Sequence, residues 1–419
     1  MQNFRGRIAV ITGGGTGMGR ELARQLTAEG CHVAMCDVSA ENMAETADLC
    51  LAAAPSGTRV TCHVADVSNE AQVFAFRDAV LAEHGTDHIN LLFNNAGIGG
   101  GGSFVADPRE EWEATFGVCW GGVYLCARAF MPLLVASDAG HIVNTSSING
   151  LWASLGPRTS HTAYSAAKFA VRGFTEALIA DLRVNAPHVK ASVVMPGHIG
   201  TSIVINSGKY FGREPKELTA EQLLEVRDRL ARRGMDVSGA SDDDLRVGMQ
   251  MQAEMFRDAA PTSAEQAATI ILDGVRRGDW RILVGDDATK LDELVQASKE
   301  TGVAVHGIID SVHWRDTLSS PDEKVRAKGL AALESALRDA KLVGADTVLL
   351  VPGVVSKDVT YQECWDRSRA EVQKVLPLAE KLKVKIAIEV VWNDFITKPE
   401  QLVEYVDSFK SEYVGAYFD

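Results

Sequence analysis

The sequence predicts an α/β protein built on a doubly wound parallel sheet, followed by a second and shorter α/β part. Short apolar, β-branched segments alternate with longer amphipathic stretches along most of the chain. The apolar segments have no polar face, which is typical of strands buried on both sides of a parallel sheet. A length of 419 residues exceeds one ordinary domain, so two domains are expected.

Seven apolar segments in the first part are expected to be strands, at residues 7–12, 32–37, 59–64, 89–94, 141–146, 190–195 and 281–285. The helical stretches between them predict right-handed crossovers. Segment 203–260 breaks this rhythm because it is long, polar and helical in pattern. It is interpreted either as a lid over a site or as a solvated helical insertion.

A second series of apolar segments occupies residues 303–310, 347–353, 385–391 and 413–419. A helix between the first two is expected to begin at Ser320-Pro321-Asp322-Glu323, which has the residues of a helix N-terminus. The first series of apolar segments ends at residue 285 and the second begins at residue 303, which places the domain boundary near residue 287. The two expected domains are therefore 1–287 and 288–419.

The composition excludes several classes of partner and location. A net charge of −14 argues against nucleic acid or an anionic membrane surface as partner. Seven scattered cysteines without metal-ligand spacing indicate reduced thiols in a cytoplasmic protein. The N-terminus leads directly into a strand, so no signal peptide is expected, and no apolar run is expected to span a membrane.

The motif TGGGTGMG, residues 12–19, joins the first strand to a helix. Gly13, Gly17 and Gly19 let the backbone turn tightly and approach a pyrophosphate, to which the helix N-terminus presents N–H groups and a positive dipole. Because the strand–loop–helix context is present, the motif predicts a dinucleotide site on a Rossmann-type sheet.

Asp37 ends the second expected strand, about twenty residues after the glycine loop. A carboxylate there accepts hydrogen bonds from the adenosine ribose and repels a 2′-phosphate. The glycine loop contains no Arg or Lys. NAD is therefore favoured over NADP, and the alternative is that Asp37 caps the following helix.

Tyr164 and Lys168 lie one helical turn apart in HTAYSAAKFAV, so they share a helix face. A phenol is a poor base at neutral pH, and a nearby ammonium stabilises its phenolate form. A serine hydroxyl from residues 146–147 would polarise a substrate carbonyl beside this pair. Tyr-x-x-x-Lys alone is common in helices, and the other reading is a structural tyrosine.

Four motifs occur along residues 1–287 in the following order: the glycine loop, NNAG (94–97), YSAAK and PGHIGT (196–201). Because the motifs have the same order in that family, residues 1–287 resemble the short-chain dehydrogenase/reductase family. The resemblance implies that Ser147 is the catalytic serine, with Ser146 as the alternative, that Tyr164 is the general acid/base and that Lys168 is its partner. It also implies a set of cofactor contacts besides Tyr164 and Lys168, namely Gly13, Thr16, Gly17, Met18, Gly19, Asp37, Asp66, Val67, Asn94, Ala96, Gly97, Pro196, Gly197, Ile199 and Thr201.

Two places depart from the family pattern. The family has an asparagine, which supports a proton-relay water, where this sequence has Cys119, unless the alignment of GVCWGG is shifted by one residue. The segment WASLGPRTSH also lengthens the chain between the serine and the tyrosine. Trp152, His161 and His198 are candidates either for substrate contact or for loop packing.

The second part resembles the xylose-isomerase-like sugar isomerase/epimerase family, on the segments VHGIIDSVHW, TVLLVPG, KIAIEVVWN and YVGAYFD. That family is a TIM barrel with a metal held by carboxylates and a histidine. Glu389 and Asp419 resemble its first two metal ligands. Residues 288–419 make about half of a barrel, and strands for the other ligands are absent, so no metal site is predicted. The segment is interpreted as a vestige, as a half that pairs with another copy, or as an interaction module.

The predicted activity is NAD-dependent interconversion of a small-molecule secondary alcohol and a ketone. The alternatives are sugar isomerisation by the second part and dinucleotide binding without catalysis. The apolar helices through 127–135 and 164–185 predict a homodimer or homotetramer, by resemblance to the family, although intrachain packing explains the same pattern.

Overall fold

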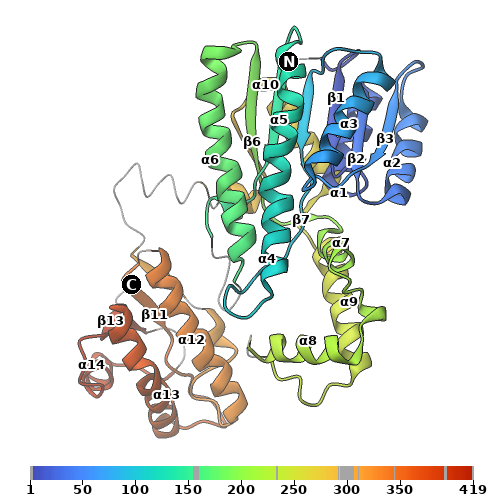
Figure 1. The fold of residues 1–419 in the computed structure, drawn as a ribbon. Coiled ribbons are helices and arrows are strands. Elements are labelled where there is room, and N and C mark those ends of the chain that lie inside the picture. Colours follow the sequence, from blue (N-terminus) through green and yellow to red (C-terminus); the bar gives the residue numbers. More distant parts are fainter. Residues whose placement is uncertain are drawn as a thin grey trace. The chain divides into compact units, whose positions relative to one another are not determined.

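The computed structural model describes residues 3–153, 160–232, 235–290, 292, 306–309, 311–343, 345–390 and 394–417. The chain forms two compact units that divide after Glu293 (Figure 1). The sequence boundary was expected near residue 287. Each unit is an α/β structure with its own hydrophobic core.

The first unit contains a seven-stranded, fully parallel sheet in the order β3-β2-β1-β4-β5-β6-β9. This confirms the predicted doubly wound sheet, and each of the seven expected segments overlaps one of its strands. The strands are β1 (Ile8–Thr12), β2 (His32–Asp37), β3 (Val60–Val64), β4 (Leu91–Asn94), β5 (Gly140–Thr145), β6 (Val189–Pro196) and β9 (Arg281–Val284).

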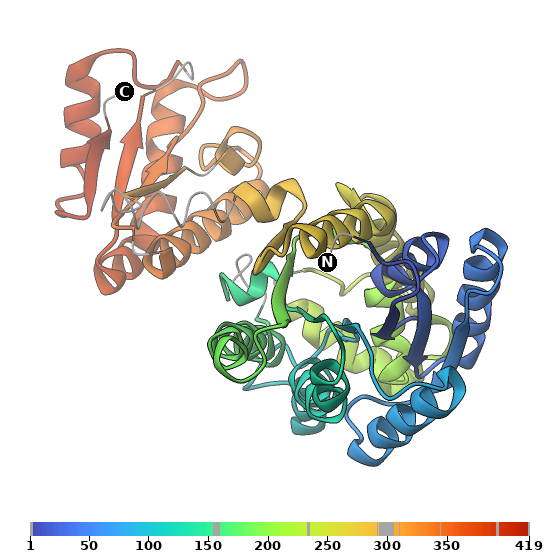
Figure 2. The ribbon, with the colours of Figure 1, turned by 90° about the horizontal axis from the view of Figure 1, so that it is seen from above.

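Helices cover both faces of this sheet, as Figure 2 shows from above. One face packs on α1 (Gly17–Ala28), α2 (Ala40–Ala53) and α10 (Ala264–Arg277). The other face packs on α3 (Glu70–His84), α4 (Arg109–Phe116), the π-helical segment η1 (Gly117–Gly121), α5 (Gly122–Val135) and α6 (Thr162–Asn185). The order of strands reverses between β1 and β4, where such folds open a crevice at the carboxyl ends of the strands.

The continuous helix Arg109–Val135 has the length and apolar composition of a membrane-spanning helix, by those two criteria alone. This corrects the expectation that no segment reaches that length. Half of its most apolar stretch is buried within the protein. Cys126, Phe130 and Leu134 lie in the core beneath the sheet, which accounts for the apolar composition.

The described residues of segment 203–260, which exclude 233 and 234, form a helical insertion at the carboxyl ends of the strands. It comprises α7 (Ile203–Tyr210), the short η3 (Pro215–Glu217), α8 (Ala220–Arg232) and α9 (Asp242–Asp258). Leu218, Leu223 and Leu245 make a small core of its own. A two-stranded parallel pair, β7 (Ile199–Gly200) with β8 (Thr262–Ser263), closes the base of the insertion.

The second unit contains a four-stranded parallel sheet in the order β10-β11-β12-β13. The strands are β10 (Gly307–Ile309), β11 (Thr347–Leu350), β12 (Lys385–Glu389) and β13 (Val414–Tyr417), with helices α12 (Glu323–Val343), α13 (Tyr361–Leu382) and α14 (Pro399–Asp407) and the short η4 (Ser311–Trp314). Helix α12 begins where the sequence predicts, and the alternation is that of an incomplete (β/α) barrel. Parts of the expected strand segments 303–310, 385–391 and 413–419 lie outside the described residues.

Candidate functional site

Two cavities meet the carboxyl ends of the strands in the first unit. The smaller, about 160 Å³, surrounds the glycine-rich loop and is called the glycine-loop cavity. The larger, about 810 Å³, is lined by Ser147 and Tyr164 and is called the Tyr164 cavity. Ile203 lines both, so helix α7 forms part of the wall of each.

The glycine loop has a backbone that only glycine fits. Gly13 has a φ of +68°, and a Cβ there would lie 2.9 Å from the Ala96 backbone. A Cβ at Gly19 would lie 2.0 Å from the Gly13 carbonyl oxygen, so the third glycine permits close helix–loop packing. Thr16 precedes α1 with an extended backbone, and its side chain forms no cap hydrogen bond. The first N–H groups of α1 therefore remain available to an anion.

Asp37 lies at the carboxyl end of β2 in the wall of the glycine-loop cavity. Its Oδ2 accepts a hydrogen bond from the Gly15 N–H at 3.0 Å, and its Oδ1 accepts one from the Ser39 N–H at 3.1 Å. The cap of α2 is Ser39, which accepts from the Asn42 N–H. Asp37 is thus held beside the loop and does not cap the helix directly.

Ten of the predicted cofactor contacts line the glycine-loop cavity: Gly13, Thr16, Gly17, Met18, Asp37, Asp66, Val67, Ala96, Gly97 and Thr201. Gly197 lines the Tyr164 cavity instead. Gly19, Asn94, Pro196 and Ile199 are not among the residues that line either cavity. Lys168, which is buried, is not among them either.

Asn94 differs most from its predicted role. Its amide is buried and donates to the Asn144 side chain at 2.8 Å, and Asn144 in turn donates to the Thr175 hydroxyl at 3.0 Å. The neighbouring Asn95 lines the cavity and donates to the backbone oxygens of Thr12 and Gly13. Alternation along β4 explains the difference, since adjacent side chains point to opposite faces of a strand.

Helix α7 adds two residues that sequence reasoning missed. Asn206 donates to the Thr16 hydroxyl at 3.0 Å, and Tyr210 lines the same cavity near Asp66. Burial raises the pKa of the Tyr210 phenol, and the Asp66 carboxylate adds to that rise. No motif marks these positions, because they reach the cavity only through the fold of the insertion.

Ser146 and Ser147 follow β5 and have different surroundings. The Ser146 hydroxyl donates to the Lys168 carbonyl oxygen at 2.7 Å and is buried. The Ser147 hydroxyl accepts from the Asn149 N–H at 3.1 Å and lines the Tyr164 cavity. Of the two candidates, Ser147 is therefore the one whose hydroxyl lies in the wall of a cavity.

Tyr164 lies in the first turn of α6, which is anchored to the glycine run at residues 99–102. The Thr162 and Ala163 N–H groups donate to the carbonyl oxygens of Gly102 and Gly101. The Lys168 ammonium lies 5.3 Å from the centre of the Tyr164 ring and donates to the Thr145 carbonyl oxygen at 2.9 Å. One buried cation thus joins the end of β5 to the tyrosine ring.

Cys119 lies in η1, where the backbone is π-helical. Its buried thiol donates to the Ile98 carbonyl oxygen at 3.2 Å. A Cβ at Gly97 would lie 3.7 Å from both the Cys119 sulfur and the Lys168 nitrogen, so these two atoms flank Gly97. The position expected to hold the relay asparagine therefore lies close to Lys168.

The Tyr164 cavity is bounded on several sides by the insertion, including α7 and α9. His161 and His198 line it, whereas Trp152 is not among its lining residues. The His198 Nε2–H group donates to the Phe256 carbonyl oxygen at 2.7 Å, and the centres of the His198 and Phe256 rings lie 4.3 Å apart. Most of the stretch that lengthens the chain before Tyr164, residues 154–159, lies outside the described residues.

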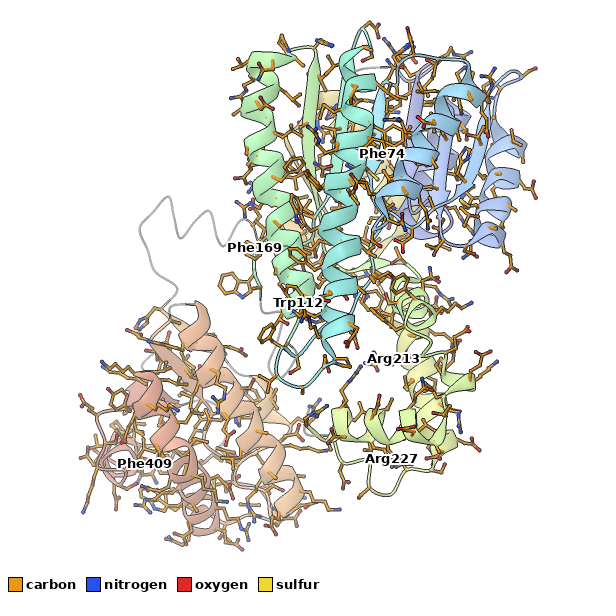
Figure 3. All side chains as sticks on the ribbon, viewed as in Figure 1. Phe74, Trp112, Phe169, Arg213, Arg227 and Phe409 are labelled. Carbon is orange, nitrogen blue, oxygen red and sulfur yellow. The ribbon has the colours of Figure 1, made fainter. Side chains whose placement is uncertain are left out.

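Eight charged side chains also line the Tyr164 cavity, and four of them form one cluster: Asp107, Glu111, Arg213 and Arg229. Figure 3 labels Arg213, whose guanidinium lies 2.7 Å from the Glu111 carboxylate. The Arg229 guanidinium lies 3.8 Å from both carboxylates. The sequence carries no motif for this cluster, since its members come from the stretch before α4, from α4, from the loop after α7 and from α8.

The second unit offers no comparable site among its described residues. Glu389 ends β12, and Asp419 lies outside the described residues. Across the described part of the chain, no group of three or more His, Cys, Asp or Glu side chains is arranged to hold a metal ion.

Comparison with known proteins identifies two family models along the chain. The model described as short chain dehydrogenase matches residues 7–210. The model described as xylose isomerase-like TIM barrel matches residues 264–419. This second match begins with α10, which the structure places on the sheet of the first unit.

Curated relatives match half or more of this chain at moderate identity. A Mycobacterium tuberculosis protein named as the oxidoreductase SadH is 36% identical over 317 residues, which cover 75% of this chain and 99% of the relative. The levodione reductase of Leifsonia aquatica is 34% identical over 233 residues, which cover 53% of this chain and 80% of the relative.

Solved structures share the fold of the first unit. A short-chain dehydrogenase/reductase from Burkholderia phymatum, solved in complex with NAD, is 30% identical with a TM-score of 0.57, and the match covers 72% of this chain and 97% of that one. A levodione reductase structure is 26% identical with a TM-score of 0.51, covering 69% and 98%.

Proposed function

Because this chain belongs to the short-chain dehydrogenase/reductase family, we propose that it interconverts a secondary alcohol and a ketone with Tyr164 as the acid/base and NAD as the preferred dinucleotide. The observation that carries the proposal is the arrangement of Ser147, Tyr164 and Lys168 beside two adjoining cavities. One cavity suits a dinucleotide and the other a substrate.

The residues of the glycine-loop cavity fit a dinucleotide. Side chains are missing at Gly13 and Gly17 where a pyrophosphate would approach, and the α1 N–H groups are directed toward it. Asp37 would hold the adenosine ribose, and Asp66 with Val67 would contact the adenine. When bound, the nicotinamide ring accepts a hydride from an alcohol or returns it to a ketone.

The protein's own groups then manage the proton. In oxidation, the alcohol O–H bond breaks as its proton passes to the Tyr164 oxygen, while the C–H bond breaks with loss of hydride and a C=O bond forms. The Ser147 hydroxyl donates to the substrate oxygen and stabilises the negative charge that develops there. The Lys168 ammonium attracts the charge left on the phenol oxygen when its proton departs.

The preference for NAD rests on Asp37. Both of its oxygens are fixed by backbone N–H groups, so the carboxylate is held at the end of β2. A 2′-phosphate beside it would meet a like charge.

The Tyr164→Phe variant tests the proposal. Secondary alcohols and ketones are screened at the nicotinamide absorbance with NAD and NADP. We expect the variant to lose roughly 10²–10⁴-fold in kcat, the usual contribution of a general acid/base, while it still binds the dinucleotide by fluorescence titration. A variant with full turnover would overturn the assignment.

We further propose a homo-oligomer in a reducing cytoplasm. Exposed apolar side chains on α5 and α6, such as Tyr124, Phe169 and Val184, support an interface between copies. All seven cysteines are unbridged, which suits a reducing compartment. Light scattering of the purified chain measures the oligomeric state, and a monomer would contradict the first part.

A further inference from the structure

The Tyr164 cavity is much larger than the reacting group requires. A volume of about 810 Å³ lies in the upper range of small-molecule sites. Only one carbon and one oxygen of a substrate need to lie between Ser147 and Tyr164. The remainder of the cavity therefore determines what else the substrate contains.

Two helices of the insertion give the cavity apolar walls. Helix α7 contributes Ile203, Val204 and Ile205, and α9 contributes Met249, Ala253 and Phe256. The three α9 residues follow a spacing of four and three, so they lie on one face of that helix. On its other face, Met251 and Met255 are 55% and 62% exposed. The apolar face toward the cavity is thus distinct from the solvent face.

The four-residue charged cluster gives another part of the cavity a different chemistry. The negative charges of its two carboxylates balance the positive charges of its two guanidinium groups, so the cluster has no net charge. Arg229 comes from α8, the helix of the insertion that Figure 1 shows farthest from the sheet. This polar part therefore draws on α8, an element that contributes neither Ser147 nor Tyr164.

Glu111 and Arg229 have unused hydrogen-bonding capacity within this cluster. Glu111 is 6% exposed, and its Oε1 accepts from the Gly101 N–H at 3.1 Å. Its Oε2 forms an ion pair with the Arg213 guanidinium at 2.7 Å and accepts no hydrogen bond from the described residues. Arg229, at 3.8 Å, is too distant for a hydrogen bond to either carboxylate. Glu111 and Arg229, which no hydrogen bond joins, thus line the same cavity and leave room for a ligand group between them.

From these features, and resting on the proposed function, we propose that the substrate is an extended secondary alcohol or ketone with an apolar body and a hydroxyl group at its far end. The apolar body would lie between α7 and α9. The far hydroxyl would donate to Glu111 Oε2 and accept from Arg229, which satisfies both groups. A carboxylate end would lie beside two buried carboxylates, and an ammonium end beside two guanidinium groups.

A series of unbranched methyl ketones from 2-butanone to 2-decanone, reduced with NADH, tests the apolar part. Each buried methylene contributes up to about fourfold in binding, so kcat/KM is expected to rise at least ~10-fold along the series. A flat series with measurable turnover would overturn this inference and leave the proposed function intact. Failure to reduce any ketone, or oxidise any alcohol, would overturn both.

A matched pair of α9 variants tests whether the rise of kcat/KM with ketone length depends on the cavity-facing side of α9. Ala253→Phe fills the cavity and should reduce the decanone-to-butanone ratio of kcat/KM at least ~5-fold, since several methylenes lose their place. Met251→Phe adds the same ring on the solvent face and should keep the wild-type ratio. Should Ala253→Phe fail to fold, Val204→Phe on α7, where Val204 is 42% exposed, fills the opposite wall. Equal decanone-to-butanone ratios in the cavity-filling variant and in Met251→Phe would overturn the placement of the apolar body between α7 and α9.

The end group is tested with three ten-carbon methyl ketones that carry a terminal hydroxyl, carboxylate or ammonium group. The hydroxyl compound is expected to have a kcat/KM at least ~10-fold above both charged compounds, and Glu111→Gln should reduce that advantage. A preference for the carboxylate or the ammonium compound in the wild-type protein would overturn the assignment of a hydroxyl.

Discussion

The two units are both parallel sheets flanked by helices, yet among the described residues only the first gathers a set of complementary chemical groups at the carboxyl ends of its strands. There, Asp37 ends β2 and Ser147 follows β5, while α6 brings Tyr164 and Lys168 to the same edge. In the second unit, the strands end at Ile309, Leu350, Glu389 and Tyr417, and Glu389 is the only acidic residue among these described ends. A parallel sheet thus provides an edge for a site, but a site forms only where several elements deliver complementary groups to it.

The sharpest test of this contrast substitutes one polar residue in each unit and compares the resulting changes in kcat. Ser147→Ala should lower kcat about 10²–10³-fold, because it removes a hydrogen-bond donor to the developing oxyanion. Glu389→Gln should leave kcat within about twofold, because Glu389 belongs to no described group of metal-binding side chains and a substitution away from such features has little effect. Steady-state oxidation of the best alcohol from the screen measures kcat for both variants.

A large loss of activity in Glu389→Gln would show that the second unit takes part in the reaction. Calorimetric titration with Mg²⁺ or Mn²⁺ then separates a metal role from a structural one. Stoichiometric metal binding that Glu389→Gln abolishes would revive the sugar-isomerase reading.

The sequence predicted the first sheet well for a physical reason. Strands such as Ile8–Thr12 are apolar on both faces, and glycine at Gly13 and Gly19 is required by the backbone, so both signals are local. Prediction was poorer where contacts arise from distant elements. Nothing near Asn94 indicates that Asn144 will engage its amide, and nothing near Arg229 indicates that α8 will bring it toward Glu111.

The buried polar groups of the first unit predict that acid destabilises it. His141 is 1% exposed, and burial, with help from the nearby Lys190 charge, lowers its pKa to about 3. The unfolded chain protonates this histidine below about pH 6.5, whereas the folded protein does not. Stability is therefore lost as the pH falls from 6.5 toward 3, by about 2 kcal/mol between pH 6.5 and 5.

Denaturant unfolding at pH 7 and pH 5 measures this loss, with turnover reporting the first unit. His141→Gln should retain more of its pH 7 stability at pH 5 than the wild-type protein does. His188→Gln replaces an exposed histidine and serves as the control. If His141→Gln and the wild-type protein lost equal stability on acidification, the buried histidine would not be the cause.

Asp37→Ala should alter the choice of dinucleotide and leave the rest of the site in place. Loss of a carboxylate that binds the ribose and repels a 2′-phosphate should lower the NAD-to-NADP ratio of kcat/KM about tenfold, the equivalent of one charged hydrogen bond. Asp48→Ala removes an exposed carboxylate from α2 and should keep the wild-type ratio. An unchanged ratio in Asp37→Ala would remove the basis for preferring NAD.

The smallest expected effect concerns Cys119, the position where the family's relay asparagine is expected from the sequence. A thiol is a weak hydrogen-bonding group, and here it is bound to the Ile98 carbonyl oxygen beside Gly97 and Lys168. Cys119→Asn supplies an amide donor and acceptor at the same place, so kcat should rise by up to about fivefold, the worth of one ordinary hydrogen bond. Cys119→Ala should change kcat by less than about twofold if the thiol contributes little. A tenfold loss in Cys119→Ala would instead mean that the sulfur itself supports Lys168, and that this enzyme organises its proton path through a group that its relatives do not use.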